Sequence, residues 1–153
     1  MITLRRTTAA DPDFHSLVAE LDIVLREIYG GKQDQYDALN KGLDNACVVV
    51  ALQDGVPAGC GCFKRINRPD AVEIKRMYVR SAVRRTGIAQ ALLTELEQWA
   101  QDLGYPATVL QTGNKQPEAI ELYRKTGYRT ISPYGSYADD PDSVCMEKAL
   151  SRG

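Results

Sequence analysis

A short basic stretch, VRRTGIAQAL at residues 83–92, lies where one apolar run ends and an amphipathic run begins. A helix that begins here leaves backbone N–H groups without partners, and its N-terminus attracts anions such as phosphate. Gly87 has no Cβ to hold a ligand away from the backbone, and Ala89 keeps the next position small. Arg84 and Arg85 can add charge-assisted hydrogen bonds. The stretch predicts a phosphate-binding turn; the alternative is a solvated basic turn that only caps a helix.

The charge and the motifs of the chain limit what this anion site can serve. The formal net charge is -1, so no overall positive field attracts nucleic acid or a membrane surface. Neither G-x-x-x-x-G-K-[ST] nor G-x-G-x-x-G occurs. The N-terminus lacks the apolar core of a signal peptide, and no apolar run reaches transmembrane length. We therefore expect a local anion site in a cytoplasmic protein without nucleic-acid or membrane partners.

The cysteine and histidine content argues against a metal or a covalent mechanism. The four cysteines include no C-x-x-C pair, so we interpret them as reduced and mostly buried thiols, with a zinc site as the weaker alternative. The single histidine, His15, stands at a predicted helix start, which does not favour a Ser-His-Asp or Cys-His mechanism. We expect no metal. The cysteines are Cys47, Cys60, Cys62 and Cys145.

The elements that must position these residues follow from the hydrophobic periodicity. With 153 residues, the chain suits one domain over 1–153, and the predicted order is β-α-α-β-β-β-α-β-α-β-β. Antiparallel strands come first and a β-α-β-α-β unit follows, which indicates a mixed α/β fold. Strands are predicted at 2–6, 47–52, 56–66, 71–79, 108–112, 128–131 and 144–148, and helices at 12–29, 34–40, 88–103 and 117–123.

At this point the pattern Arg84-x-x-Gly87-x-Ala89 resembles the [RQ]-x-x-G-x-[GA] signature of the GCN5-related N-acetyltransferases (GNAT). EIKRMYV at 73–79 is similar to the central strand of that family. QTGNKQPEAIELYRKTGY at 111–128 is similar to its second cofactor segment. The resemblance covers most of the chain. It implies an α/β (α+β mixed) fold with a central mixed, mostly antiparallel sheet of about seven strands, flanked by four helices.

The resemblance also implies acetyl-CoA as co-substrate and assigns residues to it. The backbone of the basic stretch would bind the pyrophosphate, and the end of the central strand would pair with the pantetheine arm as an extra strand. Asn114 would contact the cofactor, and Tyr123 would lie near the thioester sulfur. The pyrophosphate residues are Arg84, Arg85, Thr86, Gly87, Ile88 and Ala89, and the pantetheine residues are Met77, Tyr78 and Val79.

The implied reaction is direct attack of an amine on the acetyl thioester. Tyr123 is the candidate acid, acting through a hydrogen bond to the leaving thiolate, and a backbone N–H near Tyr78 or Val79 would hold the oxyanion. Glu73 is the candidate base; alternation along the strand places it on one face with Lys75, Met77 and Val79. The alternatives are that Tyr123 is a core aromatic residue and that Glu73 and Lys75 form a surface ion pair. A non-catalytic acyl-CoA sensor of the same fold also stays open.

Tyrosines mark two regions that could bind the acceptor, a small-molecule or peptide amine. The chain has eight tyrosines against two phenylalanines. A loop of about a dozen residues between the last two predicted strands is longer than the ~2–5 residues of most hairpin loops. With Asp34, Asp139 and Asp140, these tyrosines could line a pocket for a cationic amine; the alternative is solvated acidic loops. A homodimer through the late strands stays open. The tyrosines are Tyr29, Tyr36, Tyr134 and Tyr137.

Overall fold

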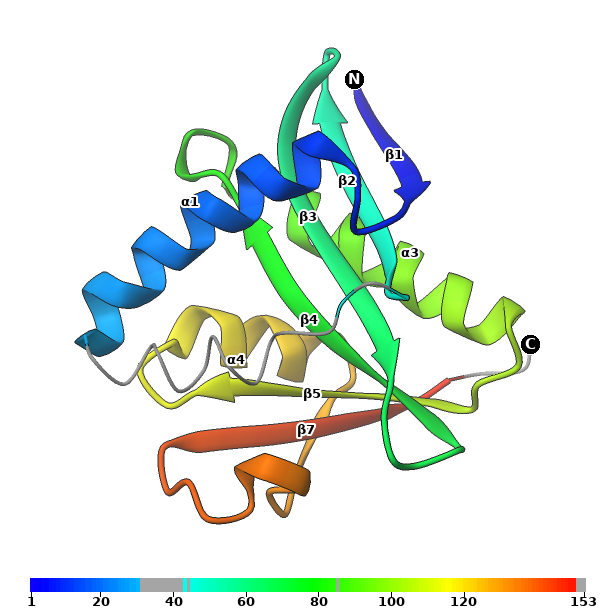
Figure 1. Cartoon of the computed structure of the whole chain (residues 1–153), viewed down its shortest axis with the longest axis vertical. Helices are drawn as coiled ribbons and strands as arrows, with labels where there is room; N and C mark the ends of the chain where they lie inside the picture. Colours follow the sequence, from blue (N-terminus) through cyan, green and yellow to red (C-terminus); the bar gives the residue numbers. More distant parts are fainter. Residues whose placement is uncertain (31–42, 44, 85, 151–153) are drawn as a thin grey trace.

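The computed structural model describes residues 1–30, 43, 45–84 and 86–150 and contains a seven-stranded mixed sheet in the order β1-β2-β3-β4-β5-β7-β6 (Figure 1). The predicted sheet is confirmed. The described part of the chain has three α-helices instead of four; the fourth, predicted at 34–40, falls outside the described residues. The strands are β1 (Ile2–Thr7), β2 (Cys47–Gln53), β3 (Val56–Arg65), β4 (Ala71–Val79), β5 (Ala107–Gly113), β6 (Arg129–Ile131) and β7 (Ser143–Ala149), and the helices are α1 (Pro12–Tyr29), α3 (Ile88–Asp102) and α4 (Pro117–Lys125).

Strands β1 to β4 pair antiparallel in chain order, with α1 inserted between β1 and β2. The β-branched run Val48-Val49-Val50 fills the centre of β2 and is fully buried. Asp54 and Gly55 both have positive φ, 52° and 85°, as a tight primed hairpin turn requires. Strands β2 and β3 thus form a hairpin, in agreement with the antiparallel strands predicted at 47–52 and 56–66.

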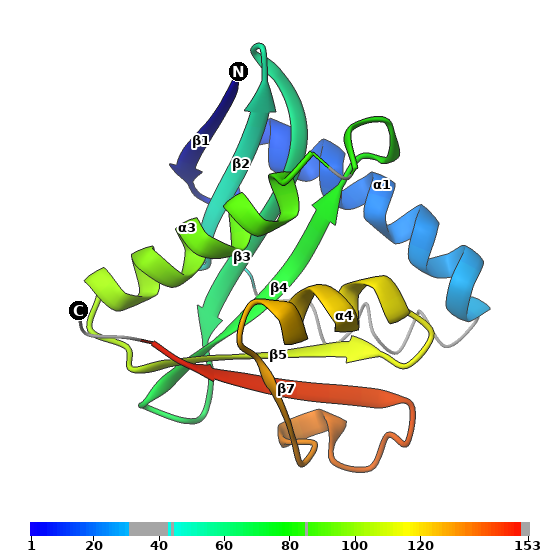
Figure 2. The same ribbon diagram turned by 180° about the vertical axis from the view of Figure 1, so that it is seen from behind.

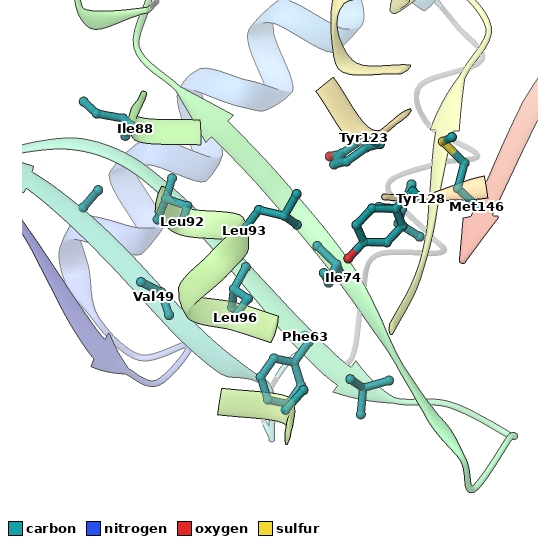
Figure 3. Packing of buried hydrophobic residues seen from close by; sticks show 14 of the residues in the cluster. Val49, Phe63, Ile74, Ile88, Leu92, Leu93, Leu96, Tyr123, Tyr128 and Met146 are labelled. Carbon is teal, nitrogen blue, oxygen red and sulfur yellow. The ribbon is translucent and has the colours of Figure 1, made fainter. Parts of the chain in front are cut away.

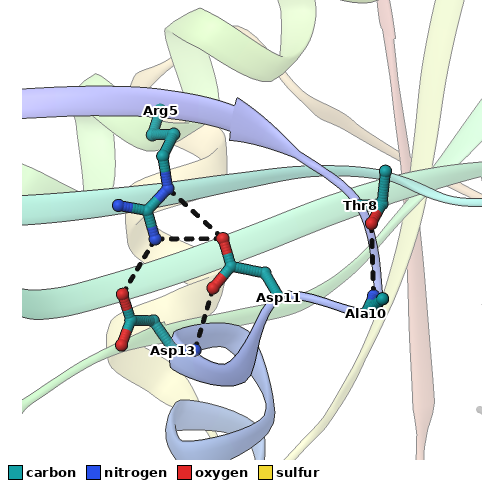
Figure 4. A network of polar contacts seen from close by, with 5 residues as sticks. All are labelled: Arg5, Thr8, Ala10, Asp11 and Asp13. Atoms are coloured by element: carbon teal, nitrogen blue, oxygen red, sulfur yellow. Dashed lines mark hydrogen bonds and ion pairs between the residues drawn. The ribbon is translucent and has the colours of Figure 1, made fainter.

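Helix α1 begins at a well-formed N-terminal cap (Figure 4). The Asp11 carboxylate accepts a hydrogen bond from the Asp13 backbone N–H at 2.9 Å, and Pro12 occupies the first helical turn. Arg5 of β1 donates to both carboxylates, at 3.0 Å to Asp11 and 2.8 Å to Asp13. Burial raises the pKa of Asp11, but these hydrogen bonds outweigh burial and lower it overall. The cap therefore fixes where α1 starts and ties it to the edge of the sheet.

The helices cover the two faces of the sheet separately. Helix α1 packs on β2, β3 and β4, where Phe14 and Leu17 join a cluster with Val48, Cys60 and Cys62 (Figure 1). Helix α3 and helix α4 lie on the opposite face (Figure 2). The larger core gathers there, and Figure 3 shows its side chains between α3, α4 and the sheet. It includes Phe63, Ile74, Leu92, Leu93, Leu96, Tyr123, Tyr128 and Met146.

Strands β4 and β5 separate soon after they meet. They pair in parallel only over Ala71–Ile74 with Ala107–Leu110, although β4 continues to Val79 and β5 to Gly113. The two ribbons diverge in both views (Figures 1 and 2). Past Ile74 the sheet therefore has a gap between two neighbouring strands, at the carboxyl ends of both.

A β-bulge in β4 lies beside this gap. Cys60 pairs with Tyr78 and Cys62 with Lys75, which leaves Arg76 and Met77 opposite the single residue Gly61. Arg76 has a φ of 59°, and this left-handed conformation costs a residue with a Cβ about 1–2 kcal/mol.

The bulge makes one sequence prediction wrong. Met77 and Val79 pack into the α3 core with Ile74, not on the face of Glu73 and Lys75. Strict alternation fails here because the extra residue shifts the side-chain period by one.

Candidate active site

A pocket lies in the gap between β4 and β5 and is lined from both faces of the sheet. On the α1 face it is lined by α1, by Glu73, Lys75 and Arg76, and by Tyr137 of the β6–β7 loop. From the α4 face it is lined by Met77 and Tyr123. Because no strand pairing closes the sheet at this level, two molecules can approach the same point from opposite faces. The remaining lining residues are Leu21, Leu25, Tyr29, Ile74, Gln111, Thr112, Gly113 and Gln116.

Tyr123 is buried in the wall of this pocket, and its role at the thioester sulfur stays a prediction. Its side chain is 6 % exposed, and its ring meets the Tyr128 ring edge-on at 5.7 Å. Burial alone raises the pKa of Tyr123 to about 12. No charged or hydrogen-bonding group among the described residues contributes to this shift. The hydroxyl is therefore a protonated donor at neutral pH, and the reading of Tyr123 as a core aromatic is also correct, because it belongs to the α3 cluster.

Glu73 lies in a buried polar cluster on the α1 face. The Lys75 ammonium is 3.2 Å from one carboxylate oxygen of Glu73, and the Tyr134 hydroxyl donates to the other at 2.7 Å. The Lys75 ammonium also donates to the Tyr137 hydroxyl at 3.0 Å. The Glu73–Lys75 pair that the sequence suggested exists, but it is not on the surface, since both side chains are 5 % exposed. The four groups thus hold one another in place behind the pocket.

The electrostatics of this cluster keep its members engaged with one another. Burial lowers the pKa of Lys75, and the Glu73 charge opposes that shift. Burial raises the pKa of Tyr134 far above its usual value, with a further contribution from Glu73, so the phenol stays protonated and donating. Both oxygens of the Glu73 carboxylate are thus occupied, one by the Lys75 ammonium and one by the Tyr134 phenol. The base role of Glu73 stays a prediction.

The basic stretch leads from β4 into α3 as the sequence predicted. Gly87 is the N-cap residue of α3 with a φ of 85°, no side chain caps the helix, and a Cβ built at Gly87 would meet open space. The Arg84 side chain donates to the Val79 carbonyl at 3.0 Å, which ties the turn back to the end of β4. The N–H groups of the first helical turn therefore face outward without an internal cap. Arg85 lies outside the described residues.

The other predicted site residues divide between the pocket and its surroundings. Tyr29 lines the pocket, and its hydroxyl accepts a hydrogen bond from Gln116 at 3.2 Å. Tyr78 points to α1 and donates to Glu20 at 3.0 Å. Asn114 stands at the β5–α4 turn, outside the pocket lining, where its backbone N–H donates to the Asp142 carbonyl at 2.8 Å. Tyr36 falls outside the described residues. The cofactor contact of Asn114 stays a prediction.

The acidic residues predicted to attract a cationic amine do not line the pocket where the structure describes them. Asp140 accepts hydrogen bonds from the Asp142 backbone N–H at 3.0 Å and from the Ser143 hydroxyl at 3.1 Å, so it shapes the β6–β7 loop. Asp139 is exposed and is not among the pocket-lining residues. Asp34 lies outside the described residues. Among the described residues, the charged ones that line the pocket itself are Glu73, Lys75 and Arg76.

Sequence reasoning missed Arg76 and two apolar residues of α1. The available signal for Arg76 was the presence of three charged residues, Glu73, Lys75 and Arg76, inside an otherwise mostly apolar strand, since charged residues are rarely buried unless they are paired. Leu21 and Leu25 were placed only within the helix predicted at 12–29. They also line the pocket, which periodicity alone cannot show.

Metal and membrane features can be reported for the described part of the chain. Within it, no group of three or more His, Cys, Asp or Glu side chains is placed to hold a metal ion, and no helix is long and apolar enough to cross a membrane. All four cysteines are free, and three are buried. Burial raises the pKa of Cys62 to about 12, so this thiol is unreactive.

Comparisons with known proteins identify the family of this chain. A model of the acetyltransferase (GNAT) family matches residues 11–128. A protein of Azospirillum brasilense named IAA acetyltransferase is 32% identical over 150 residues, which cover 97% of this chain and 98% of that protein. A solved structure from Klebsiella pneumoniae, assigned as an acyl-CoA N-acyltransferase, covers 99% of both chains with a TM-score of 0.82 and 28% identity.

A more distant structure shares the fold. A GNAT acetyltransferase of Elizabethkingia anophelis, solved with acetyl-CoA bound, has a TM-score of 0.74 and 20% identity over 97% of this chain and 98% of its own. The chain therefore belongs to the GNAT family, as the resemblance in its sequence predicts, and is an acetyltransferase enzyme.

Proposed function

We propose that this protein transfers an acetyl group from acetyl-CoA to a primary amine of a small molecule or peptide, by direct attack of the amine on the thioester. The observation that carries the proposal is the pocket in the gap between β4 and β5, which is lined by residues from both faces of the sheet. It lets the thioester reach Tyr123 while the amine comes from the α1 face. Bringing both reactants to one point supplies much of the rate enhancement without a covalent intermediate.

The backbone around the gap fits the shape of acetyl-CoA. Strand β4 continues to Val79 after its pairing with β5 ends at Ile74, so an extended pantetheine arm can lie along this strand edge. The strand leads through the turn that Arg84 holds to the uncapped N-terminus of α3. A pyrophosphate there would receive backbone N–H groups and the positive end of the helix. The edge of β4 thus suits the pantetheine arm, and the N-terminus of α3 suits the pyrophosphate of the same ligand.

Tyr123 would act on the departing thiolate as a hydrogen-bond donor. A simple thiol has a pKa of about 8.5, whereas burial raises the pKa of Tyr123 to about 12. Complete proton transfer from Tyr123 to the thiolate would cost roughly 5 kcal/mol at about 1.4 kcal/mol per pKa unit. A hydrogen bond that strengthens as negative charge develops on sulfur avoids this cost. The described residues leave the Tyr123 hydroxyl available for that contact.

Thermal denaturation with acetyl-CoA, followed by a turnover assay, tests the proposal. A ligand at 100 times its Kd stabilises a protein by about 2.7 kcal/mol, which corresponds to a Tm increase of several degrees for a domain of this size. We expect that increase with acetyl-CoA and CoA, and release of free thiol with at least one member of an amine panel. No increase in Tm would overturn the proposal. An increase in Tm without turnover on any amine would favour the acyl-CoA sensor.

A further inference from the structure

Arg76 lines the pocket with unused hydrogen-bonding capacity. Its side chain is 8 % exposed and makes one ion pair, from Nη1 to Asp22 of α1 at 2.6 Å. The Nε atom is buried and has no hydrogen-bond partner among the residues that the structure describes. A guanidinium offers a planar edge of N–H donors that matches a carboxylate. Because a buried donor without an acceptor is costly, an arginine held in this way indicates a missing anionic partner.

The bulge in β4 is what brings this guanidinium to the pocket. In a regular strand Arg76 would point to the face opposite Lys75, toward the apolar core under α3. The φ of 59° at Arg76 instead lets two consecutive cationic side chains, Lys75 and Arg76, line the same pocket. Within a strand, backbone strain of this kind clusters at active sites and ligand-binding positions.

The two cations of the pocket are not equivalent. Lys75 is engaged by Glu73 and by the Tyr137 hydroxyl, which hold it in the buried cluster. Within the described part of the chain, Arg76 pairs with Asp22 alone, whose side chain is 33% exposed and accepts from Nη1. Asp22 therefore orients the guanidinium and leaves the Nε atom for another partner. Of the two cations, Arg76 can therefore bind an anion through its Nε atom without losing an existing contact of that atom.

We propose that Arg76 binds a carboxylate of the acceptor, and that the acceptor is an amino acid or a similar small molecule with both an amine and a carboxylate. This inference rests on the proposed function and specifies its substrate class. Arg76 directly precedes Met77, where the pantetheine arm is proposed to begin, so a carboxylate held there keeps the attached amine near the thioester. The anionic groups of CoA itself have a separate place at the N-terminus of α3. A planar carboxylate suits the guanidinium edge through paired hydrogen bonds.

The test compares amino acids with their amides, which differ in the carboxylate. Thiol release is measured with saturating acetyl-CoA and a panel of the common L-amino acids, each beside its C-terminal amide. We expect the preferred amino acid to exceed its amide at least tenfold in kcat/KM. Equal rates for acid and amide in the wild-type protein would overturn the inference.

Variants then assign the preference to Arg76. Arg76→Gln should raise KM for the acid at least tenfold, leave the amide nearly unchanged and leave the Tm increase with acetyl-CoA intact. Arg76→Lys, which keeps the charge but loses the planar edge, should retain part of the preference. Arg68→Gln is the matched control, since Arg68 pairs with Glu147 and Asp70 and is not among the pocket-lining residues. A fall for acid and amide alike in Arg76→Gln would mean that Arg76 only maintains the fold.

Failure of the proposed function would be recognised separately. In that case acetyl-CoA does not raise the Tm and no amine releases thiol. The same acids and amides are then compared by their effect on Tm in the absence of acetyl-CoA. Stabilisation by an amino acid but not by its amide, lost in Arg76→Gln, would still support the carboxylate site. No difference between them would overturn it.

Discussion

Tyr123 and Tyr134 are both enclosed tyrosines near the pocket, but their hydroxyl groups are used differently. The Tyr134 hydroxyl donates to Glu73, so it serves the buried cluster. Only burial acts on the pKa of Tyr123, and its hydroxyl is left for a ligand. The sequence could indicate that Tyr123 lies on a short helix after a strand. Which tyrosine keeps an available hydroxyl depends on contacts between residues far apart in the chain, which no local pattern encodes.

Replacing Tyr123 with Phe should lower kcat and leave stability nearly unchanged. The loss of one donor aimed at developing charge costs about 10²–10³ in kcat. The folded protein loses no hydrogen bond among the described residues, so the free energy of unfolding should change by less than about 0.5 kcal/mol at pH 7. Steady-state kinetics and thermal denaturation measure both. An unchanged kcat would leave Tyr123 as a core aromatic only.

The same variant has a signature at high pH. The pKa of Tyr123 is raised from about 10 in the unfolded chain to about 12 in the folded protein. The folded state therefore holds this proton more tightly, and the resulting stability is complete below pH 10 and is lost as the pH rises toward 12. Tyr123→Phe has no phenol to ionise and should not show this loss. Between pH 10 and pH 12 the stability of the variant relative to the wild type should therefore increase.

Glu73→Gln should destabilise the protein most at neutral pH. Removing one member of a buried ion pair typically costs about 3–5 kcal/mol, because the other charge is left unpaired. Without Glu73, the pKa of Lys75, which burial already lowers, should fall further below 10.5. A lysine with a lowered folded pKa binds fewer protons in the folded state, so stability rises with pH toward 10.5. Urea denaturation from pH 7 to pH 10 should therefore show the variant approaching the wild type.

A double variant and a pH–rate profile separate the two roles of Glu73. Glu73→Gln combined with Lys75→Met removes both charges and should recover most of the stability. If the double variant is as unstable as the single one, the ion pair is not the source of the loss. An unchanged pH dependence of kcat/KM in Glu73→Gln would remove Glu73 from the base role.

At the scale of elements, the sequence predicted most boundaries because their signals are local. The cap at Asp11, the turn at Asp54-Gly55 and the glycine after α3 each act within a few residues. The bulge in β4 was missed because no glycine or proline marks it; its left-handed residue is Arg76. What holds that conformation is pairing with β3 and contact with α1, both distant in the chain.

Gly87 in the turn before α3 can be tested against Gly104, a matched control at the other end of the same helix. Gly87 and Gly104 both have positive φ, 85° and 93°, and a Cβ at either would meet no atom within 4 Å. Valine at either position should cost a similar strain of about 1–2 kcal/mol. Only Gly87→Val should weaken acetyl-CoA binding, by tenfold or more in calorimetry. We also expect Gly87→Val to weaken binding more than Arg85→Ala.

The opposite order of affinities would assign the site to the arginine side chain and not to the backbone. Equal losses of affinity in Gly87→Val and Gly104→Val would mean that strain in α3, and not access to its N-terminus, determines binding.

At the scale of the whole molecule, the sheet consists of two parts joined by a short parallel contact. Strands β1 to β4 form one part and β5, β7 and β6 the other, and they meet only over Ala71–Ile74 and Ala107–Leu110. The order of strands in the sequence predicted a mixed sheet, but it did not predict the point at which β4 and β5 diverge. That point depends on the bulge at Arg76 and on the packing of α1 and α4 on opposite faces. The pocket therefore forms only in the assembled sheet, although some of its lining residues were predicted from the sequence.

If acetyl-CoA bridges these two parts, hydrogen exchange should show it. Backbone N–H groups of β4 that point toward β5 within Ala71–Ile74 are paired and should exchange slowly, whereas those in Met77–Val79 have no partner on β5. An extended arm added along β4 would protect the second group and leave β1 and β2 unchanged. Exchange measured with and without CoA, resolved to short peptides, makes the comparison. Protection confined to the N-terminus of α3 would mean that the protein binds the pyrophosphate without pairing the arm to β4.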